Sequence, residues 1–253
     1  FLVGYGSYGY AYDPGFNLDM VSLLDRGFVH PIAHIRGGTE MGYGWYDDGK
    51  MMRKMNTFTD FIDCSAALCA EKFTSADRLF ASGRSAGGLL MGAVANMAPK
   101  QYKGIITGVP FVDVLTTMSD PSIPLTTGEY TEWGNPAVKA EYDYMKQYSP
   151  YDNLKAQEYP NMLVLTSFSD SQVQYFEPAK YVARLRDLKT DKNTLLFKTN
   201  MAGSHGGSSG RFERLKERAT EFSWMMGLLG MKEEVVNQSA FFTSNKARII
   251  FPI

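Results

Sequence analysis

The sequence is poor in the residues that mark several classes of protein. Two cysteines in 253 residues are too few for a disulfide framework, so Cys64 and Cys69 are expected to be buried free thiols of a reducing, cytoplasmic compartment. The 26 basic and 27 acidic residues leave a formal net charge of −1, which argues against a nucleic-acid partner. No segment approaches the roughly 20 consecutive apolar residues that a membrane span requires. These absences indicate a globular protein with no membrane partner. The sequence begins with Phe1 and not with an initiator methionine, so we expect the chain to begin inside a longer protein.

Short apolar runs alternate with segments whose apolar residues recur at helical spacing. The runs predict strands at residues 1–3, 27–32, 78–81, 104–109, 162–166 and 194–198, and the periodic segments predict helices at 17–24, 59–72, 89–97, 177–188 and 211–226. Such alternation is typical of an α/β fold, in which helices cover both faces of a parallel sheet and ligands bind at the carboxyl ends of the strands. Residues 113–160, rich in proline, tyrosine, tryptophan and acids, are expected to line the site.

The segment "RLFASGRSAGGLLMGAVANM", residues 78–97, places one serine between two glycines where a predicted strand meets a predicted helix. A G-x-S-x-G pattern occurs by chance in turns, but the strand before it and the helix after it favour a nucleophile turn. A turn so sharp leaves little room for side chains at Gly83 and Gly87. Ser85 would project above the sheet, and the backbone N–H of Ala86 would face a developing oxyanion.

A serine nucleophile needs a base, and the sequence has three histidines. His30 and His34 flank a short apolar run, which favours structural roles, whereas His205 lies in the glycine-rich loop "NMAGSHGGSSG" after a predicted strand. Asp170 falls in the polar turn after the run at 162–166, and capping the next helix is its alternative role. The order Ser, Asp, His at three strand ends predicts a catalytic triad.

Five longer motifs are more specific than the serine pentapeptide: "GYGSYG", "HIRGGTEMGYGWYDDGK", "GRSAGGLLMGA", "PFVDVLTTMSDPSIPLTTGEYTEWGNP" and "DSQVQYFEPAKYVARLR". They resemble the catalytic domain of oligopeptidase B, a branch of the prolyl oligopeptidase family, most closely the trypanosomatid enzymes. The resemblance implies an α/β-hydrolase domain over residues 1–230 that lacks its first strands. It also implies a β-propeller domain, absent from this chain, and leaves the tail, residues 231–253, without an account.

The resemblance assigns roles position by position. It implies that Ser85 is the nucleophile, Asp170 the orienting acid and His205 the general base. It further implies that the Tyr5 hydroxyl donates to the oxyanion beside the backbone N–H of Ala86. From the residues alone, Tyr5 would be a packed aromatic side chain.

The resemblance also implies acidic substrate pockets. Glu129 stands at the first of two positions whose acids bind a basic P1 side chain, and the second position holds Thr131. The sequence alone favours a solvated acidic loop for Glu132, and substitution for the missing acid is the alternative. Asp13 matches one of two acids for a basic P2 residue, and Gly15 stands at the other position. These departures predict weaker P1 and P2 preferences.

The sequence as a whole predicts a serine endopeptidase that hydrolyses short basic peptides after Arg or Lys through an acyl-enzyme, with no metal or organic cofactor. Three alternatives remain open: a prolyl-specific oligopeptidase with an aromatic S1 pocket formed by Tyr130 and Trp133, an esterase or lipase of the same fold, and a non-catalytic hydrolase-fold fragment.

Overall fold

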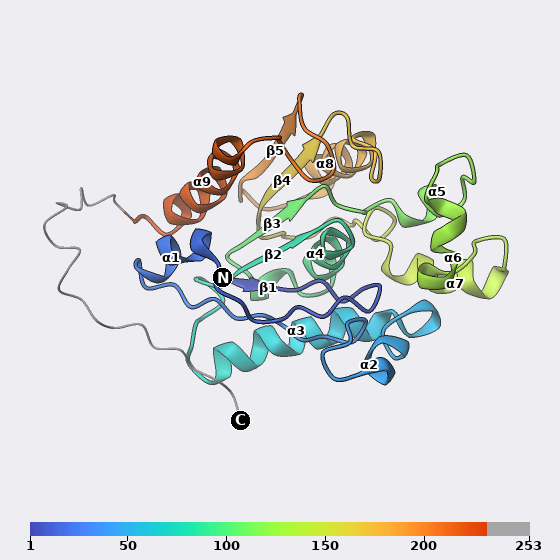
Figure 1. Cartoon of the computed structure of the whole chain (residues 1–253), viewed down its shortest axis with the longest axis horizontal. Helices are drawn as coiled ribbons and strands as arrows, with labels where there is room; N and C mark the ends of the chain where they lie inside the picture. Colours follow the sequence, from blue (N-terminus) through green and yellow to red (C-terminus); the bar gives the residue numbers. More distant parts are fainter. Residues whose placement is uncertain (232–253) are drawn as a thin grey trace, which may run out of the picture.

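A five-stranded parallel sheet forms the centre of the protein in the computed structural model, which describes residues 1–231 (Figure 1). The strands are β1 (Leu2–Val3), β2 (Phe80–Arg84), β3 (Gly104–Gly108), β4 (Asn161–Ser167) and β5 (Leu195–Asn200). Their order in the sheet is their order in the chain, and each neighbouring pair is parallel. The carboxyl ends of the strands therefore meet at one edge, where the predicted site residues follow them.

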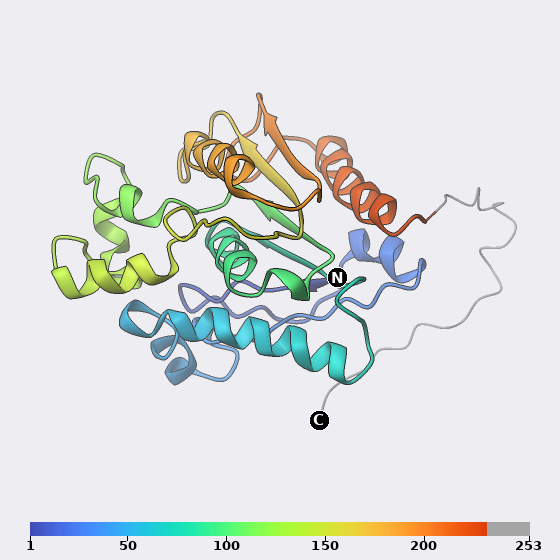
Figure 2. The ribbon, with the colours of Figure 1, turned by 180° about the vertical axis from the view of Figure 1, so that it is seen from behind.

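Helices cover both faces of the sheet, as predicted. They are α1 (Leu18–Leu24), α2 (Tyr43–Asp47), α3 (Met55–Ala70), α4 (Ala86–Met97), α5 (Val114–Met118), α6 (Tyr130–Trp133), α7 (Lys139–Tyr148), α8 (Phe176–Leu188) and α9 (Arg211–Leu228), with 3₁₀ turns η1 (Met51–Arg53), η2 (Pro99–Gln101) and η3 (Thr126–Glu129). The views from front and back place α3, α4 and α8 on one face and α1 and α9 on the other (Figures 1 and 2).

Two apolar clusters correspond to the two faces. Alternate strand residues such as Ile105 and Met162 belong to the larger cluster, while their neighbours Ile106 and Leu163 belong to the smaller one with α1 and α9. This period-two alternation buries both faces of β3 and β4, which explains their apolar runs, whereas β5 is only partly buried.

The strand predicted at residues 27–32 does not form. Ile32 and Val3 make a single parallel bridge, flanked by hydrogen bonds from the Val3 N–H to the Pro31 carbonyl at 3.1 Å and from the Ala33 N–H to the Val3 carbonyl at 2.8 Å. Proline has no N–H to donate, so the ladder cannot extend through Pro31.

The expected start of α3 and the expected burial of its two cysteines need adjustment. Helix α3 begins at Met55, four residues before the predicted start, and carries Cys64 and Cys69, which are free but only half-buried. The segment 113–160 contains α5, η3, α6 and α7, which its mixed composition did not predict. The predicted tail, apart from Met231, lies outside the described residues.

Candidate active site

Ser85 occupies the sharp turn between β2 and α4. Its backbone has φ 56° and ψ −118°, a conformation that a non-glycine residue adopts only when the surrounding structure enforces it. A Cβ added at Gly83 would overlap the backbone oxygen of Gly87, and one added at Gly87 would lie 3.1 Å from the Gly4 carbonyl oxygen. Position 83 therefore requires glycine, as the sequence predicted, whereas a Cβ at Gly87 would need its neighbours to shift by a few tenths of an ångström. The turn presents Ser85 at the carboxyl edge of the sheet.

Asp170 and His205 come together from the loops after β4 and β5. The two carboxylate oxygens of Asp170 lie 2.8 and 3.0 Å from His205 Nδ1. The backbone N–H groups of Gln172 and Val173 also donate to this carboxylate, at 2.8 and 2.9 Å. Burial opposes ionisation of Asp170, but the hydrogen bonds from His205 and the two amides outweigh it and lower the pKa of the carboxyl group. Asp170 therefore both tightens its turn and orients the imidazole.

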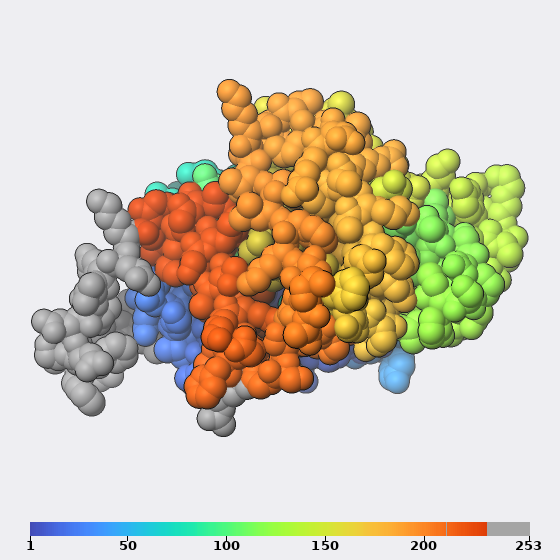
Figure 3. Space-filling model, turned by 90° about the horizontal axis from the view of Figure 1, so that it is seen from above, coloured from blue at the N-terminus to red at the C-terminus, as the bar shows by residue number. Residues whose placement is uncertain are grey.

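The His205 side chain lies near the surface, with 17% of its area exposed. Figure 3 shows its loop, in orange, beside the gold segment that follows β4. When Nδ1 donates its proton to Asp170, Nε2 is left as the acceptor of the neutral imidazole.

Two cavities meet at Ser85 and Tyr5, the residues that line both. One cavity, of about 300 Å³, is also lined by Ala86 and Glu129 and is called here the Glu129 cavity. The other, of about 410 Å³, is also lined by His205 and is called here the His205 cavity. Ser85 thus lies between an acidic cavity and a cavity that contains a histidine.

Tyr5 and Ala86 line the Glu129 cavity with Ser85, and each has a hydrogen-bond donor. Burial, assisted by the negative charges of Glu129 and Glu132, raises the pKa of Tyr5 to about 12, so the phenol keeps its proton at neutral pH. Ala86 is the first residue of α4, where backbone N–H groups have no acceptor within the helix. Both groups therefore keep a proton to donate within a cavity that Ser85 also lines.

Glu129 is the acidic group of the Glu129 cavity. Its Oε2 accepts hydrogen bonds from the Tyr8 hydroxyl at 2.5 Å and from Trp133 Nε1 at 2.7 Å. Two donors on one oxygen fix the carboxylate and leave Oε1 for a ligand. The rest of the lining is mostly apolar and includes Phe111, Met118, Ile123, Leu125 and Val173. A long cationic side chain matches this combination, because its methylene groups pack on apolar atoms while its head meets the carboxylate.

Glu132 does not enter this cavity, and its interpretation as a solvated acid is also wrong. The residue is 3% exposed, and its carboxylate accepts hydrogen bonds from the Tyr8 N–H at 3.0 Å and the Tyr46 hydroxyl at 2.7 Å. Lys54 Nζ lies 3.8 Å away. These partners occupy the carboxylate, so the structure does not bring Glu132 to the position of the missing second acid.

Lys54 is a residue near the site that no sequence pattern predicted. It is fully buried, and its ammonium group donates to the Gly6 carbonyl at 2.5 Å and to Ser7 Oγ at 2.8 Å. Burial lowers the pKa of Lys54 to about 8, although Glu132 opposes this shift. No local pattern distinguishes this lysine from an exposed one, because both of its partner groups are distant in sequence.

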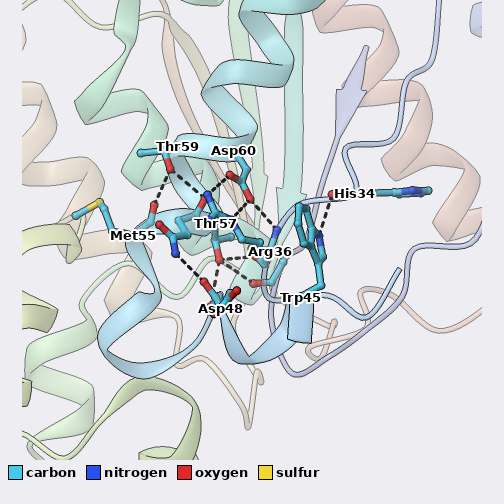
Figure 4. A network of polar contacts seen from close by, with 11 residues as sticks. His34, Arg36, Trp45, Asp48, Met55, Thr57, Thr59 and Asp60 are labelled. Carbon is cyan, nitrogen blue, oxygen red and sulfur yellow. Dashed lines mark hydrogen bonds and ion pairs between the residues drawn. The ribbon is translucent and has the colours of Figure 1, made fainter. Parts of the chain in front are cut away.

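A polar network at the start of α3 supports the loop that contains Tyr5 and Gly6 (Figure 4). The Arg36 guanidinium donates to both carboxylate oxygens of Asp60, at 2.8 and 2.6 Å, and the Thr57 hydroxyl donates to the Arg36 carbonyl at 2.6 Å. The same hydroxyl lies 3.4 Å from the Gly6 carbonyl. The loop that carries Tyr5 is therefore held at the Gly6 carbonyl by Lys54 and Thr57, both from the start of α3.

Asp13 and His34 line neither cavity, whereas His30 lines the His205 cavity. Asp13 is exposed. His30 Nδ1 lies 2.9 Å from the Phe1 carbonyl and His34 Nε2 lies 3.1 Å from the Tyr12 carbonyl, contacts that agree with structural roles. Within residues 1–231, no group of three or more His, Cys, Asp or Glu side chains has the arrangement of a metal site. No helix in that part of the chain is both long and apolar enough to span a membrane.

The parallel sheet, the serine at a strand-to-helix turn, and the acid–histidine pair from two later strand ends define an α/β-hydrolase domain. The model of the prolyl oligopeptidase family, Peptidase_S9, matches residues 14–232. The chain belongs to the prolyl oligopeptidase family, which confirms the resemblance found in its motifs.

Curated relatives and solved structures agree with this assignment. The chain is 63% identical over 227 residues to dipeptidyl aminopeptidase BI of Pseudoxanthomonas mexicana, covering 90% of the chain and 31% of the relative. It is 55% identical to Protease 2 of Moraxella lacunata, covering 92% and 34%. The structure of oligopeptidase B from Leishmania major matches with 50% identity and a TM-score of 0.89, covering 90% of this chain and 32% of that one. The chain thus spans about a third of the length of these relatives.

Proposed function

We propose that this chain is the catalytic domain of a serine oligopeptidase that cleaves short peptides on the carboxyl side of Arg or Lys. The observation that carries the proposal is the meeting, at Ser85, of a cavity with an oriented carboxylate and a cavity with a histidine bound to a buried aspartate. The first provides selectivity for the acyl side, and the second provides a base.

The proposed reaction is acyl transfer in two steps. His205 Nε2 removes the proton from Ser85 Oγ as the oxygen attacks the peptide carbonyl, and Asp170 stabilises the imidazolium that forms. The Tyr5 hydroxyl and the Ala86 N–H donate to the oxyanion of the tetrahedral intermediate. His205 then protonates the leaving amine, and water repeats the sequence on the acyl-enzyme.

The P1 preference follows from Glu129. Arg and Lys both place a cation at the end of a flexible stem, and the guanidinium of Arg can bind a carboxylate with two parallel hydrogen bonds. Only one oxygen of Glu129 is left for the substrate, and Thr131 offers no charge, so we expect a modest preference over neutral residues. A prolyl-specific pocket or an esterase acyl pocket would leave this carboxylate without a cationic partner, at a desolvation cost.

Two features of the whole protein are part of the proposal. Because relatives are about three times as long as this chain, we infer that a β-propeller domain accompanies it and limits access to short peptides. The free thiols of Cys64 and Cys69 favour the cytoplasm. The name of the 63% identical relative makes removal of N-terminal dipeptides the second candidate activity.

The experiment that tests the proposal is labelling of the chain with a fluorophosphonate probe, with an arginyl aldehyde as competitor and Ser85→Ala as control. Labelling that the aldehyde blocks and the variant abolishes supports the proposal. A folded chain that resists labelling refutes it.

Coumarin amides of Ala-Arg, with free and acetylated amino termini, separate the two candidate activities, because a dipeptidyl aminopeptidase requires the free amine. An Ala-Pro coumarin amide tests for prolyl specificity, and a fatty ester tests for esterase activity. Glu129→Gln is the matched control for P1 selectivity. It should reduce the ratio of Arg to norleucine cleavage by about tenfold or more, the range expected for one charge-assisted hydrogen bond. An unchanged ratio contradicts the role of Glu129.

A further inference from the structure

The two cavities that meet at Ser85 carry charge of opposite sign. Glu129 is the acidic side chain of one cavity. The charged or titratable side chains that line the other, apart from its tyrosines, are Arg84, Arg218, His30 and His205, with no aspartate or glutamate among its described lining residues. The electrostatic environment therefore reverses across the reacting serine.

Most of the basic groups in the His205 cavity already have partners. Arg218 Nη1 donates to Glu221 at 2.8 Å, and its Nε lies 3.7 Å from Asp19. His205 is bound to Asp170. Burial lowers the pKa of His30, so this imidazole is neutral at neutral pH. These groups contribute little net charge to the cavity.

Arg84 is the exception. It is half-buried, and residues 1–231 provide no ion pair for it within 4 Å. It directly precedes Ser85, and its side chain lies over the end of β3, since a Cβ added at Gly108 would approach Arg84 Cγ and Cζ at 3.0 Å. An arginine without a carboxylate partner, beside the nucleophile, is placed to bind an anionic ligand.

The position of His205 indicates which half of a substrate enters this cavity, given the proposed function. His205 lines this cavity and not the Glu129 cavity. The same imidazole must protonate the leaving amine, so the residues after the scissile bond lie on its side. The volume of about 410 Å³ is that of a small-ligand pocket, which suits a short leaving segment.

We propose that Arg84 binds a carboxylate on the leaving half of the peptide and so sets a preference after the scissile bond. The carboxylate is either the terminal group of a short leaving fragment or an Asp or Glu side chain just after the cleavage site. Arg84 and Glu129 together would orient the substrate, with a cationic residue before the scissile bond and an anionic group after it.

Three peptides test the proposal: acetyl-Ala-Arg-Ala-Ala as the free acid, the same peptide as its amide, and acetyl-Ala-Arg-Asp-Ala amide. We expect kcat/KM for at least one of the two peptides with an added carboxylate to exceed that of the neutral amide by about fivefold, the upper range for a partly exposed ion pair. Comparison of the two then identifies the source of the carboxylate. Equal values for all three peptides overturn the inference.

Arg84→Gln should bring close to one the ratio of kcat/KM for each peptide with an added carboxylate to kcat/KM for the neutral amide. Arg84→Lys should restore part of these ratios. A purely structural role for Arg84 would lower all three values together and leave the ratios unchanged, which overturns the inference. Glu129→Gln is the matched control, expected to weaken the P1 preference while the ratios persist.

Binding to the Ser85→Ala variant gives a readout that does not depend on turnover. At least one of the two peptides with an added carboxylate should bind about fivefold more tightly than the neutral amide, and Arg84→Gln should remove the difference. If the folded protein neither cleaves nor binds any of the three peptides, the proposed function itself fails. If it binds and cleaves all three peptides equally well, only the inference about Arg84 fails.

Discussion

Replacement of Tyr5 by phenylalanine removes one hydroxyl from the point where the two cavities meet. Tyr5 lines both cavities beside Ser85, and burial raises its pKa to about 12, so it acts as a neutral donor throughout the working pH range. A donor that acts on the oxyanion stabilises the transition state more than the ground state. Tyr5→Phe should therefore lower kcat and leave KM nearly unchanged.

The magnitude follows from the surroundings of Tyr5. Loss of one preorganised oxyanion donor costs about 2.7–4 kcal/mol, or about 10²–10³ in kcat. Tyr5 is only half-buried, and Ala86 supplies a second donor, so the lower end of this range is expected. Because its pKa lies far above neutrality, the pH dependence of kcat/KM below pH 9 should keep its shape.

The assay is steady-state hydrolysis of an acetylated Ala-Arg coumarin amide. Tyr10→Phe is the matched control, since Tyr10 packs edge-on against Tyr5 at 5.4 Å between ring centroids and lines the His205 cavity with Tyr5. Loss of the Tyr10 hydroxyl should change kcat by less than about threefold, corresponding to the roughly 0.5 kcal/mol of an ordinary surface substitution. A drop in Tyr10→Phe as large as that in Tyr5→Phe, or an increase in KM at constant kcat, would refute the oxyanion role.

Three further predictions concern stability, measured by urea unfolding. Glu132→Gln should lower the free energy of unfolding by about 3 kcal/mol, because it leaves the buried ammonium of Lys54 without a charged partner. The double variant Glu132→Gln, Lys54→Met should lower it by less, because it removes both charges. Burial raises the pKa of Glu177 from 4.5 to about 8. The stability that the protonated carboxyl group contributes is therefore fully present below pH 4.5 and is lost as the pH rises through 8, by up to about 5 kcal/mol. Glu177→Gln should flatten this pH dependence of the free energy of unfolding. Gly83→Ala should cost several kcal/mol through overlap with the backbone of α4, whereas Gly128→Ala, which meets no atom within 4 Å, should have little effect.

The sequence was informative where structure depends on neighbouring residues. Apolar runs and helical spacing predicted the central strands and the main helices, because burial of one or both faces imposes those periods on local sequence. The glycines at positions 83 and 87 predicted the sharp turn because such a turn depends on residues that are adjacent in the chain. The strand at 27–32 failed because one proline interrupts a ladder that the apolar pattern alone would support.

The candidate site was predictable in part. The placement of Ser85, Asp170 and His205 at strand ends follows from chain order in a parallel sheet, and the structure brings the latter two within hydrogen-bond distance. The placement of Glu129 in a cavity followed only from family motifs, since a glutamate in an irregular segment has no distinguishing period. Asp13, assigned in the same way, lies outside both cavities.

The contacts that connect the site could not be predicted, because each joins groups far apart in the chain. Tyr8 shows this most clearly: its N–H donates to Glu132, 124 residues away, and its hydroxyl donates to Glu129, 121 residues away. Tyr8 follows Tyr5 in the same loop, so the buried pair of Lys54 and Glu132 fixes both Tyr5, the proposed oxyanion donor, and the acidic wall of the Glu129 cavity. Under the proposed function, a substrate that contacts Glu129 contacts the unit that positions Tyr5, so selectivity at P1 and stabilisation of the oxyanion would depend on one folded structure.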